Sequence, residues 1–246
     1  MNLNKRWLKA ELHTHCNLDP HDHRICDFSA ERLITEAARL HYDVLAITCH
    51  NLDVWTGELS DYAYSQGITL IPGMEVTVDR SRHTLVYNFR MGCENLNTLA
   101  KIGRHSRSDT MVIAPHPFFP GLSCLRNSIE ENIGLFDAIE SSGFYLRGLD
   151  FNRRARALAQ RYSKPLIGSG DVHYLWQLGK TFTWIYSEPG VPAVIRAVKQ
   201  GSVLVESTPL SCLEAASWWA SGLWRTAFGT RLSPAHETDS ALPQRF

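Results

Sequence analysis

Short apolar segments alternate with segments of helical character from about Trp7 to Val205. The apolar segments are rich in β-branched residues, and their alternation with helices is the pattern of parallel βα units. The predicted strands are Val44–Thr48, Ile68–Pro72, Thr84–Phe89, Met111–Ala114, Leu135–Ile139 and Pro165–Ser169. The pattern therefore predicts an α/β barrel.

Two of the intervening segments have a clear helical pattern. Ser29–His41 begins with a residue type that caps helix N-termini. Its apolar residues form one stripe, made of Leu33, Ile34, Ala37, Ala38 and Leu40. Asn152–Tyr162 has the same character and precedes the strand at Pro165. Both segments are predicted to be helices.

The composition changes after Leu210, so we expect the barrel to occupy residues 1–210. Cys212–Phe228 contains three tryptophans and is predicted to be an amphipathic helix, with residues 211–228 packed on the barrel. Packing on a dimer partner and contact with a membrane surface are alternatives. Residues 229–246 form a polar tail.

Size and charge narrow the classes of function. A chain of 246 residues with 44% hydrophobic content can bury a substantial core in one domain. Lys plus Arg and Asp plus Glu number 25 each, so no overall field would attract nucleic acid or an anionic membrane. A local basic pocket remains compatible with this balance.

The cysteines and the N-terminal segment favour a cytoplasmic protein. The six cysteines, at positions 16, 26, 49, 93, 124 and 212, show no C-x-x-C spacing, which argues against a zinc finger or a thioredoxin-like motif. Residues 1–12 lack the apolar core of a signal peptide. No segment approaches the roughly 20 apolar residues of a membrane-spanning helix, so we expect no membrane partner.

The informative histidines follow apolar runs directly. The residues placed in this way are His13, His15, His50, His116, Asp171 and His173. In α/β barrels the carboxyl ends of the parallel strands open on one face, where catalytic residues gather. Imidazole and carboxylate are ligands that suit Zn, Mn or Fe. The set therefore predicts metal-dependent chemistry rather than a serine or cysteine nucleophile.

Two local patterns support a shared metal site. In His13-Thr-His15, strand alternation points both imidazoles to the same side. Glu75 ends another apolar run, and Gly73 would let the backbone bend so that this carboxylate reaches inward and bridges two cations. A solvated glutamate and unrelated surface or core histidines are the alternatives. Repetition of the pattern at further strand ends argues against them.

Six motifs occur in a recognisable order along the chain: ELHTH, AITCHN, IPGMEV, HTLVYNF, APHPFF and GSGDVH. Together they resemble the motifs of the polymerase and histidinol phosphatase (PHP) superfamily, over roughly Glu11 to Val205. The resemblance implies a distorted (β/α)7 TIM-like barrel. It also implies two to three divalent metal ions, Mn, Fe or Zn, and phosphoesterase activity.

The resemblance implies a set of metal ligands position by position. One metal would be held by His13, His15, Glu75 and Asp171. A second would be held by Glu75, His83 and His116, with Glu75 as the bridge. A third would take His50, His173 and a residue of the loop after His15.

The loop ligand and position 49 depart from the family pattern. The loop reads Cys16-Asn-Leu-Asp-Pro-His-Asp-His23 instead of the common Ser-Asp-Gly version. Asp22 is the preferred ligand and His21 the next. Cys49 precedes His50 where the family usually has Asp, so a hydrogen bond that orients a ligand is lost, or the site gains an oxidisable thiol. A buried structural cysteine is the alternative.

The mechanism implied is in-line attack on phosphorus by a metal-bound hydroxide. Asp171 or Asp22 would shuttle the proton. Arg147 is a candidate contact for the phosphate, and a solvated surface arginine is the alternative. Phe118 and Phe119 would line a substrate pocket or belong to the barrel packing.

The expected substrates are a phosphomonoester, such as a nucleotide or sugar phosphate, or a short oligonucleotide. Neutral net charge makes long duplex DNA an unsuitable partner, whereas a short single strand would fit. The alternatives are a metal-dependent amidohydrolase and a non-catalytic metal-binding module.

Overall fold

The computed structural model describes residues 4–89, 95–218 and 220. The chain divides into two compact units, Met1–Leu210 and Ser211–Phe246. In the second unit residues 212–218 are helical. The rest of the predicted Trp-rich helix and the predicted polar tail 229–246 lie outside the described residues, apart from residue 220. The packing of residues 211–228 stays a prediction.

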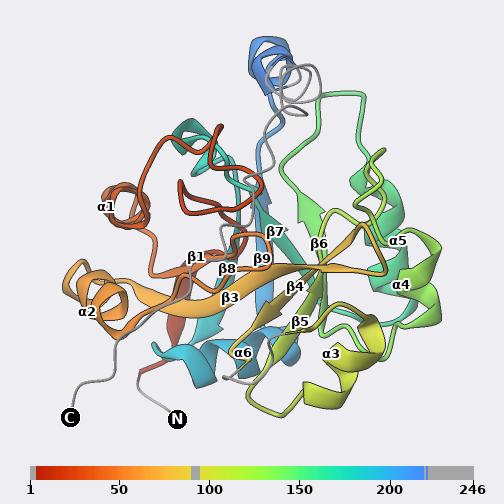
Figure 1. The fold of residues 1–246 in the computed structure, drawn as a ribbon, viewed down its shortest axis with the longest axis horizontal. Coiled ribbons are helices and arrows are strands. Elements are labelled where there is room, and N and C mark those ends of the chain that lie inside the picture. Colours follow the sequence, from red (N-terminus) through yellow and green to blue (C-terminus); the bar gives the residue numbers. More distant parts are fainter. Residues whose placement is uncertain (1–3, 90–94, 219, 221–246) are drawn as a thin grey trace, which may run out of the picture. The chain divides into compact units, whose positions relative to one another are not determined.

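The first unit is built on one nine-stranded sheet with the order β7-β6-β5-β4-β3-β2-β1-β8-β9. Its strands are β1 (Arg6–Glu11), β2 (Val44–Ile47), β3 (Thr69–Val78), β4 (Arg82–Tyr87), β5 (Met111–Ala114), β6 (Ala138–Ser142), β7 (Leu166–Ser169), β8 (Thr181–Ser187) and β9 (Val203–Ser207). Its helices are α1 (Ala30–Arg39), α2 (Gly57–Ser65), α3 (Leu99–His105), α4 (Asn127–Glu131), α5 (Asn152–Arg161) and α6 (Val191–Lys199), with a short 3₁₀ helix η1 (Leu175–Gln177). Figure 1 shows α1 and α2 beside β1–β3, and α3–α5 beside β4–β6.

The sheet is mixed, so the prediction of parallel units throughout is wrong for three strands. β4 is antiparallel to β3 and β5, β8 is antiparallel to β1, and β9 is antiparallel to β8. The cause at β4 is the short connection Asp79–Ser81, in which Asp79 and Arg80 take positive φ angles of 48° and 82°. Such a turn joins antiparallel strands only, because a parallel pair needs a long crossover.

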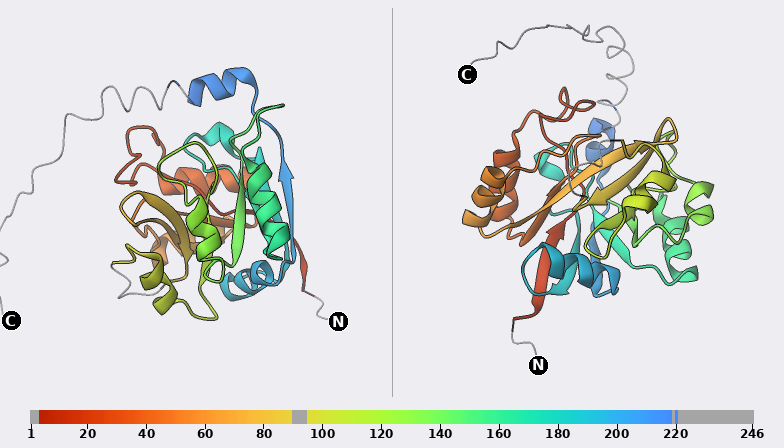
Figure 2. Two further views of the ribbon diagram at one scale, coloured as in Figure 1. Left: turned by 90° about the vertical axis from the view of Figure 1, so that its right-hand side faces the viewer. Right: turned by 60° about the horizontal axis from the view of Figure 1, so that its bottom comes forward.

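The sheet curves into a nearly closed barrel, which confirms the predicted distorted TIM-like fold. β7 approaches β8 through Thr183, whose Oγ1 accepts from Gly168 N and donates to Gly168 O, both at 2.8 Å. A parallel bridge between Thr14 and Val172 joins the segments that follow β1 and β7. The carboxyl ends of these two strands therefore meet at one mouth. Figure 2 shows the barrel from two further sides.

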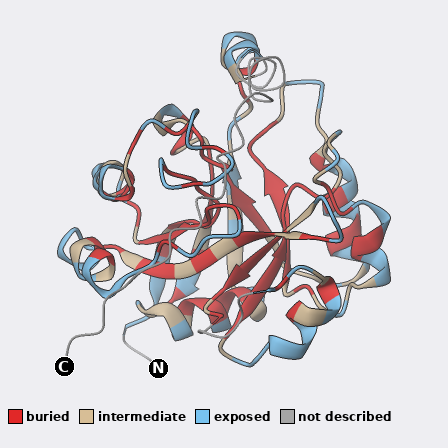
Figure 3. Cartoon of the chain, in the orientation of Figure 1, coloured by how far each residue is buried: buried red, intermediate tan, exposed pale blue. Residues whose placement is uncertain are grey.

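Three apolar clusters hold the barrel and its helices together. One cluster lies inside the barrel and includes Leu8 and Ala10 from β1, Leu12 just after it, and Val194 and Val198 from α6. The other two place α1 and α2, and α3 to α5, against the outer faces of the strands. Figure 3 shows that the strands are largely buried while the helices keep exposed outer faces. Because α6 covers the end where the strands begin, the opposite end is left for the site.

Local sequence signals place several element ends close to their predicted positions. Ser29 Oγ accepts a hydrogen bond from Arg32 N at 3.2 Å, so Ser29 is the N-cap of α1 as expected. β3 runs past its predicted end at Pro72 to Val78, so Glu75 lies inside a strand and not at its end. Gly73 is needed for close packing and not for a bend, because a Cβ there would lie 2.9 Å from the ring of Tyr87.

The closure at Gly168 gives a test of the fold. A Cβ at this position would lie 2.6 Å from Val205 Cγ1 and 3.0 Å from Phe182 O, so Gly168→Ala is expected to push β7 away from β8 and β9. The expected loss in the free energy of unfolding is roughly 1–3 kcal/mol, measured by chemical denaturation. Gly57→Ala is the control, because a Cβ there meets nothing within 4 Å. Equal stability of the two variants would contradict the tight closure.

Candidate metal centre

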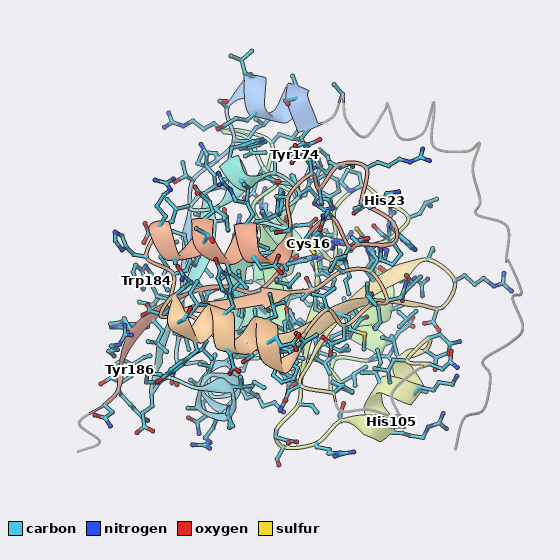
Figure 4. The ribbon with its side chains drawn as sticks, turned by 60° about the vertical axis from the view of Figure 1, so that its left-hand side comes forward. Cys16, His23, His105, Tyr174, Trp184 and Tyr186 are labelled. Carbon is cyan, nitrogen blue, oxygen red and sulfur yellow. The ribbon has the colours of Figure 1, made fainter. Side chains whose placement is uncertain are left out.

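The predicted ligands converge on the open end of the barrel. Figure 4 shows Tyr174, the neighbour of His173, toward one end of the molecule, Cys16, the neighbour of His15, near the middle, and His105 and Tyr186 toward the other end. His13 and His15 follow β1, and Asp171 and His173 follow β7. The bridge between Thr14 and Val172 brings these two pairs together.

β3 and β4 add the next two side chains. Glu75 lies in β3 and is bridged to His50, which comes after β2. His83 is the second residue of β4 and pairs with Thr77 of β3. Because β4 runs antiparallel, its first residues lie at the mouth. The antiparallel strand, which the sequence pattern did not predict, is therefore the reason that His83 reaches the site.

One group of ligand atoms matches the first predicted metal site. Potential ligand atoms of His13, His15, Glu75 and Asp171 all lie within 4.8 Å of one another, and all four residues are buried. Nε2 of His13 is 3.3 Å from both Glu75 Oε2 and Asp171 Oδ1, and it has no hydrogen-bond partner. A buried nitrogen aimed between two carboxylates, without a hydrogen bond to either, fits a ligand of a divalent cation.

Glu75 connects this group to further imidazoles. Its Oε1 lies 2.8 Å from His83 Nδ1 and 3.2 Å from His116 Nε2, which joins the predicted members of the second site. Its Oε2 lies 3.1 Å from His50 Nε2. The residues His50, Glu75 and His83 form a second group with metal-ligand spacing. Glu75 is thus shared between two groups, as a bridging carboxylate must be.

The loop after His15 supplies two carboxylates to a third group, His15, Asp19, Asp22 and His50. Asp22 Oδ2 is 2.6 Å from His173 Nε2 and 3.6 Å from His50 Nδ1, so Asp22 meets both imidazoles predicted for the third metal. Asp22 is buried. The geometry is that of the preferred loop ligand.

Asp19 is the residue of this group that the sequence reasoning did not select. Its Oδ2 accepts from His15 Nδ1 at 2.7 Å, and from the backbone N of His50 at 2.8 Å. Its Oδ1 accepts from the backbone N–H groups of His21 and Asp22. These bonds fix the loop and turn the His15 ring. The only sequence signal was an acidic residue four positions after His15.

Other predicted residues lie nearby or at the surface. His21 is exposed and stacks on His50 with ring centroids 4.8 Å apart. Arg147 is exposed, and within the part of the chain that the structure describes it makes no ion pair or hydrogen bond with the ligand group. Phe118 and Phe119 are half-buried, and Phe119 packs edge-on to Phe151 at 5.1 Å. The structure therefore does not bring Arg147 to the metal ligands.

The thiol at position 49 points into the apolar core. Cys49 is fully buried, and its Sγ lies 3.6 Å from Cys16 Sγ in the cluster that packs under α1. Burial and the contact with Cys16 raise the pKa of the Cys49 thiol. Cys16, Cys26, Cys49, Cys124 and Cys212 are all free thiols, and Cys93 lies outside the described residues. These contacts are those of a structural cysteine.

Carboxylates and imidazoles compensate one another in this buried space. Burial disfavours the charged form of Glu75, but the imidazoles around it, His83 foremost, hold its pKa well below the ordinary value. Burial likewise opposes protonation of His13 and His15, but the carboxylates outweigh it and raise the pKa of both, that of His15 to about 9. Protons on the imidazoles thus balance the carboxylates where cations would otherwise do so.

His173 differs from the other imidazoles. Burial and the nearby His15 lower the pKa of His173 to about 4, so this ring is neutral at pH 7. A neutral imidazole is the form that binds a metal. Asp171, although buried, keeps a pKa well below the ordinary value because His13 and His173 offset the effect of burial.

Comparison with known proteins agrees with this geometry. Residues 150–203 match the PHP-associated (PHP_C) family, a segment that includes Asp171 and His173. A two-domain protein from Bacteroides vulgatus, which contains a predicted PHP-like metal-dependent phosphoesterase, shares the fold with a TM-score of 0.61 and 15% identity, over 84% of this chain and 66% of that one. This similarity shows that the chain has the fold of that PHP-like protein.

Two further solved structures share the fold of this chain. PsfC from Pseudomonas syringae has a TM-score of 0.60 and 16% identity, over 90% of this chain and 99% of PsfC. The lesion-specific endonuclease PfuEndoQ from Pyrococcus furiosus has a TM-score of 0.57 and 14% identity, over 81% of this chain and 58% of the endonuclease. No curated protein matches the sequence. None of the described helices is long and apolar enough to cross a membrane.

The pKa shifts give a prediction for metal binding. Because the ligand imidazoles must lose their protons, apparent affinity for a divalent cation is expected to rise with pH through about 9, the pKa of His15. Competition with a metal-sensitive chelator between pH 6 and 10 measures this. A constant affinity, after correction for the chelator's own protonation, would contradict the assignment of His13 and His15.

The loop gives a second prediction. Asp22→Ala is expected to lower the number of bound metals by one, because it removes the carboxylate that meets His173 and His50. His21→Ala is the matched control in the same loop, since His21 is exposed and lies on the outer face of His50. Elemental analysis after dialysis counts the metals. A lower count in His21→Ala and not in Asp22→Ala would make His21 the ligand.

Proposed function

We propose that the protein is a metal-dependent phosphoesterase that hydrolyses a phosphomonoester, such as a nucleotide or sugar phosphate, or a short oligonucleotide. The observation that carries the proposal is Glu75, a buried carboxylate with each oxygen facing different imidazoles. A carboxylate shared in this way suits two adjacent cations, and paired cations are typical of phosphoryl-transfer enzymes.

Divalent cations bound here would supply a nucleophilic hydroxide near neutral pH and would neutralise phosphoryl oxygens. The chain's own residues hold these cations and fix their surroundings. His13, His15, Glu75 and Asp171 would hold one, and Glu75 with His83 and His116 a second. Asp22, His50 and His173 would hold a third. No serine or cysteine nucleophile is required.

Asp171 and Asp22 are the proposed proton carriers. Both are buried at the mouth, and each lies next to an imidazole of another segment: Asp171 Oδ1 is 3.2 Å from His15 Nε2, and Asp22 Oδ2 is 2.6 Å from His173 Nε2. A low pKa keeps Asp171 ionised at neutral pH, so it can accept a proton. Arg147 is also proposed to contact the phosphate. Its side chain is exposed, so this contact would form only when a bound substrate draws the side chain toward the site.

The comparisons support a hydrolase, but they do not identify the type of bond that it hydrolyses. The protein from Bacteroides vulgatus contains a predicted phosphoesterase, and PfuEndoQ is an endonuclease. The chain spans about two thirds of the first and about three fifths of the second. The substrates of those two proteins therefore do not identify the substrate of this chain. Amide hydrolysis by the same cations is the competing reaction.

The experiment is a metal count followed by an activity screen. Mn-, Fe- and Zn-loaded protein is tested on phosphomonoesters, short oligonucleotides and amides. His13→Ala and Asp171→Ala are expected to reduce phosphate release by more than about 10–100-fold. A loss of about 10–100-fold is typical for residues that hydrogen-bond to a metal ligand without contacting the metal. His105→Ala, an exposed histidine of α3, is the control and should keep full activity. If the metal-loaded protein cleaves amides but no phosphate ester, amide hydrolysis replaces phosphoester hydrolysis as the proposed activity.

A further inference from the structure

Glu140 is a buried carboxylate beside the metal centre that the set of ligands does not include. It is the third residue of β6 and has no exposed surface. Three groups from three other parts of the chain donate hydrogen bonds to it. A buried carboxylate with this many donors is a fixed structural element, and its partners show what it fixes.

The first partner is the imidazole of His13. Glu140 Oε1 accepts from His13 Nδ1 at 2.9 Å. This bond places the proton of the neutral ring on Nδ1 and leaves Nε2 as a lone pair facing Glu75 and Asp171. Histidine ligands commonly donate their second ring nitrogen to a carboxylate, which fixes the tautomer and the ring orientation.

The second partner is the backbone of His116. Glu140 Oε2 accepts from His116 N at 2.5 Å. His116 has a φ of 28°, a conformation that residues with a side chain rarely adopt. A conformation of this kind persists only where its surroundings hold it. The bond from Glu140 therefore holds the backbone that carries the His116 imidazole toward Glu75.

The third partner fixes the carboxylate itself. Ser169 Oγ, at the end of β7, donates to Glu140 Oε1. Ser169 is fully buried and stands two residues before Asp171. Glu140 thus connects β6 with the ends of β1, β5 and β7, each of which leads directly into a predicted metal ligand.

We propose that Glu140 is a positioning residue that sets the geometry of two predicted metal ligands, His13 and His116, which belong to the two metal sites sharing Glu75. The inference rests on the proposed metal-dependent function. It predicts that a small chemical change at Glu140 weakens metal binding without disturbing the barrel.

Glu140→Gln is the sharpest variant. The glutamine side chain has the same shape, but it offers one acceptor oxygen and one NH₂ donor in place of two acceptor oxygens. Its NH₂ must face either His13 and Ser169 or the N–H of His116, so at least one donor meets a donor. Glu130→Gln on α4 is the matched control, because Glu130 accepts from Arg161 and Tyr162 at the surface.

The measurements are metal affinity, by chelator competition with Mn and Zn, and the melting temperature of the metal-free protein. Glu140→Gln is expected to lower metal affinity roughly 10–100-fold, to leave the metal-free melting temperature within the range of the control, and to regain activity in excess metal. Ser169→Ala should show the same change in affinity to a smaller degree, since it removes one of the three donors.

The other outcomes contradict the proposal in distinct ways. Wild-type metal affinity in Glu140→Gln would show that Glu140 does not set ligand geometry, while the metal-dependent function would stand. A lower melting temperature of the metal-free variant, with normal affinity in Ser169→Ala, would assign Glu140 to the barrel structure alone. Absence of metal binding in the wild-type protein would remove the proposed function itself.

Discussion

The compensation of buried negative charge at the mouth of the barrel determines the arrangement of the site. Glu75 is only 1% exposed, and Asp171 is 8% exposed. Ionised carboxylates at such positions are strongly destabilising unless positive charge and hydrogen bonds surround them. Imidazoles from five different strands or strand ends meet this requirement in the metal-free protein. Divalent cations, as proposed for this site, would compensate the same charge.

An outer layer of carboxylates holds the imidazoles in place. Asp19 accepts from His15 Nδ1, and Glu140 accepts from His13 Nδ1. These bonds leave Nε2 of His13 directed at Glu75 and Nε2 of His15 directed at Asp171. The outer layer thus converts flexible side chains into ligands of fixed orientation, which is the condition for binding cations in a defined geometry.

The barrel contributes by bringing segments that are far apart in sequence to one place. Contacts between His15 and Asp171 and between Asp22 and His173 span more than 150 residues of chain. They depend on the meeting of the ends of β1 and β7, which the bridge between Thr14 and Val172 secures. The apolar interior and α6 fill the opposite end, so the polar groups gather at one mouth only.

The sequence by itself determined the fold class and the placement of several histidines directly after strands. These features have local signals: apolar runs, the Ser29 cap, and histidines directly after strands. The structure brings together His13, His15, Glu75 and Asp171, the four residues that the family resemblance had grouped. Asp22 lies beside His173, and its role as the loop ligand stays a prediction.

Only the tertiary structure decided the remaining features. The antiparallel direction of β4, the place of Glu75 inside β3, and the roles of Asp19 and Glu140 depend on contacts between distant segments. Glu140 lies inside an apolar strand, and the sequence around it gives no indication of its hydrogen-bond partners. The proposed role of Glu140 follows from its contacts with the ends of β1, β5 and β7. Hydrogen bonds across the barrel are set by the closure of the sheet and not by neighbours in sequence.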